Sequence, residues 1–193
     1  LDHISIETLP SNGTLLLSGN AVSAGDQISV ANISNLVFRP VANANGDDYD
    51  TFTFSVNDGT VDSGTYTMTI DVTAVNDAPL ATDDADAVNE DATITESSGS
   101  ELLVADDTDT DGNTLTVTQI AITGGSNSSV TSSTTYSNGT SITGTYGTLT
   151  VGANGSYTYV ADQSASDDLD ASDPATDSFT YTISDGTTTD TAT

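Results

Sequence analysis

The chain has 193 residues and carries 29 acidic side chains against one arginine, Arg39, and one histidine, His3, so its formal net charge is −28. The absence of Cys excludes disulfides and thiolate metal sites, and the absence of Lys excludes Schiff-base catalysis and Walker-type phosphate binding. A surface this negative repels nucleic acid and anionic lipid, and no apolar stretch approaches the roughly 18 residues of a membrane span, so we expect neither nucleic-acid binding nor membrane insertion.

Aspartate dominates the acidic residues, with 25 Asp against 4 Glu. Asp is a poor helix and strand former, a good turn residue and a short oxygen ligand. This balance predicts many short strands joined by acidic loops. One-sided charge also opposes a compact fold by self-repulsion, so we expect divalent cations to neutralise part of it.

Apolar and polar residues alternate with a period of two along much of the chain, as in β-strands that bury one face. The apolar positions of the predicted strands are, in chain order, Phe52, Phe54 and Val56; Tyr66, Met68, Ile70 and Val72; Leu115 and Val117; Ile120 and Ile122; Leu149 and Val151; Tyr157 and Tyr159; and Phe179, Tyr181 and Ile183. Gly-containing turns separate these strands. We therefore expect an all-β fold of antiparallel β-sandwiches, with these positions facing the core.

The sequence contains an internal repeat. Three pairs of segments correspond: 49–60 with 176–187, which lie 127 positions apart, Gly13-Thr14-Leu15 with Gly147-Thr148-Leu149, and Ile4-Ser5-Ile6 with Ile120-Ala121-Ile122. The correspondence indicates two copies of one module.

The boundary between the copies is predicted after the strand that ends near Val75, because Pro79 resists continuing a strand ladder. Comparison of the two copies indicates that both are incomplete. We expect a first module at 1–75 without its first strands, a linker at 76–79, and a second module at 80–193 whose last strand is truncated.

Several segments carry a resemblance to known repeat families. In the first module they are Leu9 to Leu17, Val22 to Gly25, Asn43 to Gly46 and Phe52 to Gly59, which resemble the cadherin-like repeat of large bacterial surface proteins. In the second they are Asp109 to Leu115, Gly147 to Val151 and Phe179 to Gly186, which resemble a VCBS-type repeat. The resemblance implies two tandem Ig-like or cadherin-like sandwiches. It also implies a secreted RTX-type adhesin of the bacterial cell surface, where such repeats serve adhesion or biofilm formation as calcium-stiffened rods or as binding modules.

The same resemblance implies calcium ligands. The linker Val75 to Pro79 resembles the calcium-binding linker of cadherins, and Asp109-Thr110-Asp111 resembles their Asp-x-Asp pair. Asp58 and Asp185 stand where cadherins place an aspartate before a glycine. Calcium takes about 6 to 8 oxygen ligands, which short carboxylates from several loops can supply. The alternative stays open that each of these acidic side chains is solvated and binds no calcium.

We hypothesise one calcium-binding cluster at the junction of the modules. Its ligands are expected to be Asn76, Asp77, Asp109, Asp111 and Asp185 with Asp48 or Asp50, while Asn113 could add a carbonyl oxygen and Asp58 is a further candidate. A second acidic group precedes the strand at Phe179 and would serve a following joint together with Glu90; it comprises Asp167, Asp168, Asp170, Asp173 and Asp177.

The sequence contains few residues that could act together in catalysis, so we expect that the protein is not an enzyme. His3 is the only imidazole and is expected as an exposed strand residue, which leaves no Ser-His-Asp arrangement. Arg39 is expected to form a salt bridge with a nearby Asp.

The leading functional interpretation is a calcium-stiffened extracellular spacer whose partners are neighbouring repeats of the same polypeptide. Two alternatives remain. The Ser- and Thr-rich insertion Gly124 to Thr145 could recognise surface glycans or like modules, or the chain could be an accessory domain of a secreted polysaccharide hydrolase.

Overall fold

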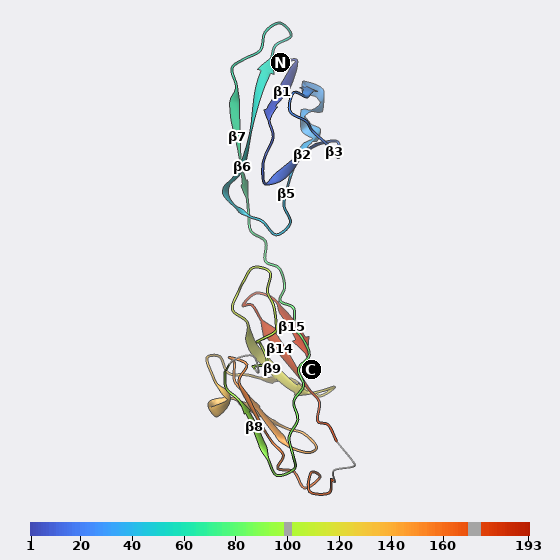
Figure 1. Ribbon diagram of the computed structural model, residues 1–193, viewed down its shortest axis with the longest axis vertical. Coiled ribbons are helices and arrows are strands. Elements are labelled where there is room, and N and C mark those ends of the chain that lie inside the picture. Colours follow the sequence, from blue (N-terminus) through green and yellow to red (C-terminus); the bar gives the residue numbers. More distant parts are fainter. Residues whose placement is uncertain (99–101, 170–174) are drawn as a thin grey trace. The chain divides into compact units, whose positions relative to one another are not determined.

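The computed structural model describes residues 1–98, 102–169 and 175–193, which divide into two compact units, Leu1–Val75 and Asn76–Thr193 (Figure 1). Residues 76–79, the expected linker, belong to the second unit. Every strand pairing in both units is antiparallel, which confirms the predicted all-β sandwich class. No helix among the described residues is long and apolar enough to cross a membrane.

Unit 1 pairs its strands into a four-stranded and a three-stranded sheet, ordered β4-β1-β6-β7 and β3-β2-β5. The elements are β1 (His3–Thr8), β2 (Gly13–Leu17), β3 (Asn20–Ala21), β4 (Gln27–Ser29), the 3-10 helix η1 (Val30–Asn35), β5 (Leu36–Pro40), β6 (Gly46–Asn57) and β7 (Tyr66–Val72). Ile6, Ile28 and Phe52 of the larger sheet pack with Leu15 of the smaller one to form the core.

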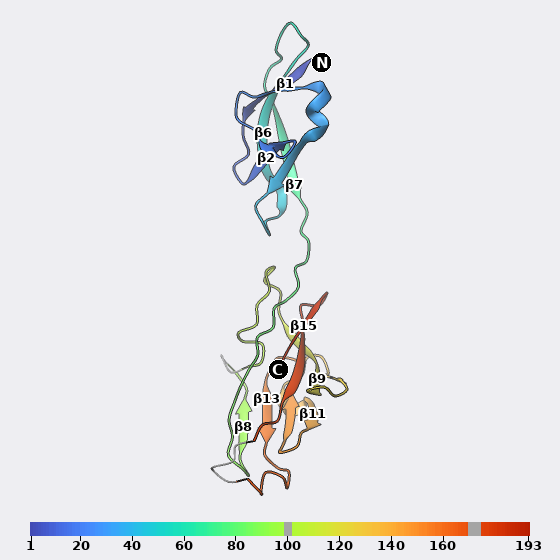
Figure 2. The same ribbon diagram turned by 90° about the vertical axis from the view of Figure 1, so that its right-hand side faces the viewer.

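Unit 2 has two four-stranded sheets, ordered β10-β9-β14-β15 and β11-β12-β13-β8 (Figure 2). The elements are β8 (Thr93–Glu96), β9 (Thr116–Ile122), β10 (Ser128–Ser129), the 3-10 helix η3 (Tyr136–Asn138), β11 (Thr140–Thr143), β12 (Thr148–Val151), β13 (Tyr157–Val160), β14 (Phe179–Ser184) and β15 (Thr189–Ala192). The insertion 124–145 thus contains β10, η3 and β11.

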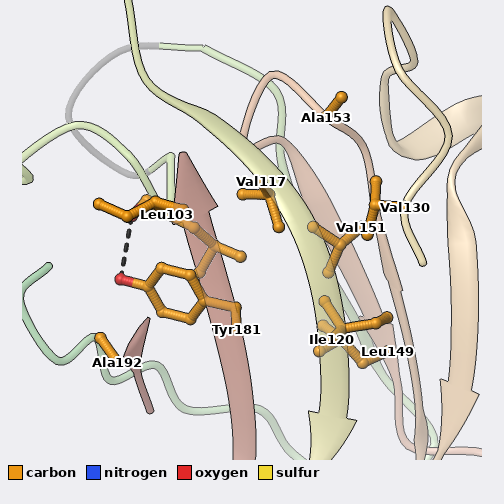
Figure 3. Close-up of a cluster of buried hydrophobic side chains, with 10 residues drawn as sticks. Leu103, Val117, Ile120, Val130, Leu149, Val151, Ala153, Tyr181 and Ala192 are labelled. Atoms are coloured by element: carbon orange, nitrogen blue, oxygen red, sulfur yellow. Dashed lines mark hydrogen bonds between the residues drawn. The ribbon is translucent and has the colours of Figure 1, made fainter. Parts of the chain in front are cut away.

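The core of unit 2 draws on both sheets, as Figure 3 shows. Val117 and Ile120 come from β9, Val151 comes from β12, and Val151 and Ile183 have no exposed surface. Tyr181 of β14 lies in the same cluster and donates a hydrogen bond from its hydroxyl to the carbonyl of Leu103 at 3.1 Å. The aromatic ring is therefore part of the core while its hydroxyl has a partner.

One of the three sequence correspondences is wrong in register. Phe54 and Tyr181 are equivalent positions of the repeat; Ile6 pairs with Phe54, and Ile120 pairs with Tyr181. Ile6 therefore corresponds to Ile120 rather than to Ile122. The two registers differ by two residues, a shift that keeps the same side chains on the same face, so the alternation alone does not distinguish them.

The prediction of a fully buried apolar face is wrong for part of β7. Tyr66 and Met68 are 57% and 45% exposed. β7 is the edge strand of a four-stranded sheet, and the opposing sheet of unit 1 has only three strands, so less surface is available to cover its side chains. Ile122, at the end of β9, is likewise 40% exposed.

Two further expectations about single residues are wrong. His3 lies in β1 as expected but is largely buried, with 15% of its side chain exposed and Nδ1 3.0 Å from an oxygen of Asp2. Arg39 forms no ion pair within the described part of the chain. It lies at an exposed position of β5 opposite Thr14, so its guanidinium remains in water.

Candidate metal centre

Three separate segments of unit 2 meet at the start of that unit. The side-chain amide of Asn76 donates to Oδ2 of Asp185 at 2.8 Å, and the backbone N–H of Asp77 donates to Oδ2 of Asp111 at 2.7 Å. The two residues that follow Val75 are therefore tied to the loop before β9 and to the turn after β14. Here the structure brings together four of the residues that the sequence predicted as ligands.

The loop Asp109 to Asn113 is shaped by Asp109 itself. Its Oδ1 accepts hydrogen bonds from the backbone N–H groups of Asp111 and Asn113, both at 3.0 Å, and Gly112 adopts a positive φ of 73°. The other oxygen, Oδ2, is buried and has no hydrogen-bond partner among the described residues. A buried carboxylate oxygen without a partner is costly, so Oδ2 of Asp109 would gain from a bound cation.

Asp185 closes the turn between β14 and β15. Its Oδ1 accepts from the N–H groups of Thr187 and Thr188, both at 2.6 Å. The hydrogen bond from Asn76, followed by that from the Thr188 backbone, holds the pKa of Asp185 well below its ordinary value. The carboxylate is therefore ionised at neutral pH.

Asp58 has the same role in unit 1, where it precedes Gly59. Its Oδ1 accepts from the Thr60 hydroxyl at 2.6 Å and from the backbone N–H of Val61 at 3.0 Å. The Thr60 side chain, followed by the backbone of Val61, lowers the pKa of Asp58 to about 2. The aspartate before glycine is thus a turn-forming residue in both units.

Asp48 and Asp50 also belong to unit 1, where the carboxylate of Asp50 is held by backbone N–H groups. Asp50 is only 6% exposed and accepts from the backbone of Ser11 at 3.1 Å and of Asn12 at 2.6 Å. Asp48 has a positive φ of 49°, and its N–H donates to Asp71. The carboxylate of Asp50 therefore holds a loop, which differs from the ligand role predicted for it.

The described members of the second predicted acidic group differ in their surroundings. Asp177 accepts from three backbone N–H groups, those of Thr145, Tyr146 and Gly147, at 2.7, 2.9 and 3.1 Å. Asp167 and Asp168 are exposed, while Asp170 and Asp173 lie outside the described residues. Glu90 is exposed in the segment before β8.

Sequence analysis missed another acidic group in unit 2, formed by Asp83, Asp84, Asp106, Asp107 and Asp190. Asp107 accepts from the N–H of Thr82 at 2.8 Å, and its other oxygen is buried without a partner. Burial, together with the smaller effect of the charges of Asp106 and Asp84, raises the pKa of Asp107 to about 6. In the sequence, the adjacent aspartates Asp83-Asp84 and Asp106-Asp107 were the feature that could have revealed this group.

Within the described ranges, no three acidic or histidine side chains lie close enough together to hold a metal ion. In the group around Asp109, the carboxylate of Asp185 accepts a hydrogen bond from the side-chain amide of Asn76. The carboxylate of Asp111 accepts one from the backbone N–H of Asp77. Its donors are nevertheless hard oxygen atoms, with one buried carboxylate oxygen unpaired. These donors fit the chemistry of calcium.

A family model described as the bacterial cadherin-like domain matches residues 76–193. The match starts at the first residue of unit 2 and covers the segment that sequence analysis compared with VCBS-type repeats. A search of curated proteins gave no match.

Proposed function

The chain belongs to the bacterial cadherin-like domain family, and on this premise we propose that it is a calcium-binding extracellular repeat module that acts as a spacer in a bacterial cell-surface adhesin. Its partners would be the neighbouring repeats of the same polypeptide. The observation that carries the proposal is the attachment of Asn76 and Asp77 to Asp185 and Asp111, next to the unpaired oxygen of Asp109.

The residues that would hold calcium are Asn76, Asp77, Asp109, Asp111 and Asp185, with Asn113 adjacent to them. Calcium would supply positive charge among these carboxylates and relieve part of the repulsion within the chain. The chain already restrains residues 76 and 77 through hydrogen bonds to the loop and the turn. Bound calcium would strengthen that restraint, so fewer residues after Val75 would be free to move and the spacer would be stiffer. We leave Asp48, Asp50 and Asp58 out of this ligand set, because local contacts account for Asp50 and Asp58 and all three belong to unit 1.

Thermal unfolding in chelator, in calcium and in magnesium tests the ion dependence. We expect a rise in Tm that is specific to calcium, because a ligand that binds only the folded state stabilises it. The double variant Asp109→Asn, Asp111→Asn should lose this rise. The matched variant Asp167→Asn, Asp168→Asn, which removes two exposed charges elsewhere, should keep it. An unchanged rise in the first variant would remove both residues from the site.

Stiffening needs a separate measurement. The chain contains no Cys, so spin labels at Asn20→Cys and Ser141→Cys, both exposed positions, would be unique. We expect calcium to narrow the distribution of distances between these labels. A distribution of the same width with and without calcium would contradict the spacer proposal, even if calcium raised Tm.

A further inference from the structure

We propose that unit 2 has a binding site for a small organic cation, of the alkylammonium class, in a cavity of about 750 Å³ lined by both of its sheets. This volume lies within the range of small-molecule sites in proteins. The proposal is independent of the proposed function, because it uses none of the residues that would hold calcium there: Asn76, Asp77, Asp109, Asp111, Asn113 and Asp185.

Aromatic side chains form much of the cavity wall. Unit 2 has six aromatic residues, and five of them line the cavity: Tyr146, Tyr157, Tyr159, Phe179 and Tyr181. Tyr157 and Tyr159 lie two apart on β13 and so share one face of that sheet, while Phe179 belongs to β14 of the other sheet. The rings of Tyr159 and Phe179 meet edge to face, with centroids 6.1 Å apart. Aromatic surface is therefore presented from both sheets.

Carboxylates line the same cavity and are bound to the tyrosines. The hydroxyl of Tyr157 donates to Asp86 at 3.0 Å, that of Tyr159 to Asp177 at 2.7 Å, and that of Tyr181 to Asp84 at 2.6 Å. Burial, followed by these hydrogen bonds, raises the pKa of all three tyrosines. The tyrosines therefore stay neutral and their rings are held in place. Their hydroxyl protons are donated to the carboxylates and are not free to bind a ligand.

The cavity has no positive charge of its own. Asp84, Asp86, Glu90 and Asp177 line it, and unit 2 contains no Lys or Arg, since Arg39 is the only such residue in the chain. An anionic ligand is excluded by repulsion. A neutral sugar would leave four carboxylates without a counter-ion and would find the tyrosine donors occupied.

An organic cation matches both parts of the wall. Its charge is attracted to carboxylates and to the faces of aromatic rings, and its alkyl groups favour apolar contact. A bare metal ion fits less well, because it makes no use of aromatic faces and because no three described carboxylates converge on one point. The combination of aromatic and acidic lining therefore selects a cation with an apolar body.

The test compares choline with its neutral isostere 3,3-dimethylbutan-1-ol and with methyl glucoside, using the full chain in saturating calcium. Four of the seven tyrosines line the cavity, so the ring NMR shifts of Tyr146, Tyr157, Tyr159 and Tyr181 report on binding there. We expect saturable binding of choline and about tenfold weaker binding of the isostere, which corresponds to losing one cation–π or ionic contact. Equal binding of the isostere, preferential binding of the glucoside, or no saturable binding of choline would overturn the proposal.

Two variants localise the site. Asp86→Asn should weaken choline binding severalfold, whereas Asp91→Asn, at an exposed acid of the same segment that does not line the cavity, should leave it unchanged. Both positions are exposed, so neither substitution disturbs the core. Choline binding should persist in the Asp109→Asn, Asp111→Asn variant, and the calcium-dependent rise in Tm should persist in Asp86→Asn. If Asp86→Asn and Asp91→Asn weakened choline binding equally, the effect would come from the overall charge. That result would contradict the assignment of the binding site to the cavity.

Discussion

Asp50 and Asp177, which lie 127 positions apart, hold the same loop in the two units. Asp50 accepts from the backbone of Ser11 and Asn12, and Asp177 accepts from that of Thr145 to Gly147. In each unit the loop leads into the Gly-Thr-Leu segment of the second sheet. Burial alone raises the pKa of both carboxyls, but the hydrogen bonds outweigh it and lower both values. The pair is therefore a structural element of the repeat.

Replacing either aspartate should destabilise its own unit. We predict that Asp177→Ala lowers the free energy of unfolding of unit 2 by about 2 kcal/mol, because it leaves backbone donors without a charged acceptor. Since the folded pKa of Asp177 is below the ordinary value of 3.8, its contribution to stability is present above that value and is lost as pH falls through the folded pKa. Urea unfolding measures the loss.

The calcium dependence of this loss separates a loop-holding residue from a ligand. We expect Asp50→Ala and Asp177→Ala to cost the same free energy in chelator and in calcium. Asp47→Ala, an exposed acid close to Asp50, should change stability by less than about 0.5 kcal/mol. A larger cost for Asp50→Ala in calcium would restore Asp50 to the metal site.

The glycine of the Gly-Thr-Leu segment is required by an aromatic neighbour. A Cβ at Gly13 would clash with the ring of Phe38, and one at Gly147 would clash with Tyr159 and the carbonyl of Val160. We predict that Gly147→Ala destabilises unit 2 by about 1 to 3 kcal/mol, the usual cost of overpacking. Gly64→Ala, where a Cβ meets nothing within 4 Å, is the control and should be neutral or slightly stabilising in urea unfolding. Similar losses in both variants would point to a backbone effect instead.

Asp107 should make stability depend on pH in the opposite sense to Asp177. Its folded pKa, raised by burial to about 6, lies above the ordinary value of 3.8. Between these values the folded chain binds more protons than the unfolded chain, so stability falls as pH rises through this range. We predict that Asp107→Asn, which keeps an acceptor for Thr82, raises Tm at neutral pH. The gain should vanish near about pH 4, where the carboxyl is protonated in the folded chain.

Thermal unfolding in chelator across this pH range measures the effect without metal. Asp167→Asn serves as the control, because it removes one negative charge at an exposed position. An increase in Tm of the same size for both variants would mean that net charge, rather than burial of Asp107, is responsible. A gain that persists at low pH would contradict the assigned cause.

Tyr181 anchors the segment that precedes β8. Its hydroxyl lies 2.7 Å from the carbonyl of Thr82 and 2.6 Å from Asp84, in addition to its contact with Leu103. We predict that Tyr181→Phe costs about 1 to 3 kcal/mol, because buried acceptors lose their donor. Amide hydrogen exchange of residues 80–86 should accelerate as this anchor is lost. Tyr136→Phe, whose hydroxyl has no hydrogen-bond partner among the described residues, should change neither quantity.

The sequence by itself determined the fold class and the equivalence of the two strands at Phe52 and Phe179. These features are local: alternation with a period of two and glycine turns are properties of neighbouring residues. The match between the two Gly-Thr-Leu segments also held, because Leu15 and Leu149 are both buried in the second sheet of their units. The register of Ile120 was missed, since a shift of two residues leaves the alternation of a strand unchanged.

Only the tertiary structure decided what each acidic residue does. In the sequence Asp50, Asp107 and Asp109 look alike. The carboxylate of Asp50 holds a loop, Asp107 and Asp109 each have a buried oxygen without a partner among the described residues, and burial raises the pKa of Asp107. The cavity likewise joins aromatic residues of β13 and β14 with carboxylates from segments far away in the sequence. Whether a carboxylate is solvated, hydrogen-bonded or left unpaired depends on which donors come within about 3 Å, and strand pairing between distant residues sets that distance.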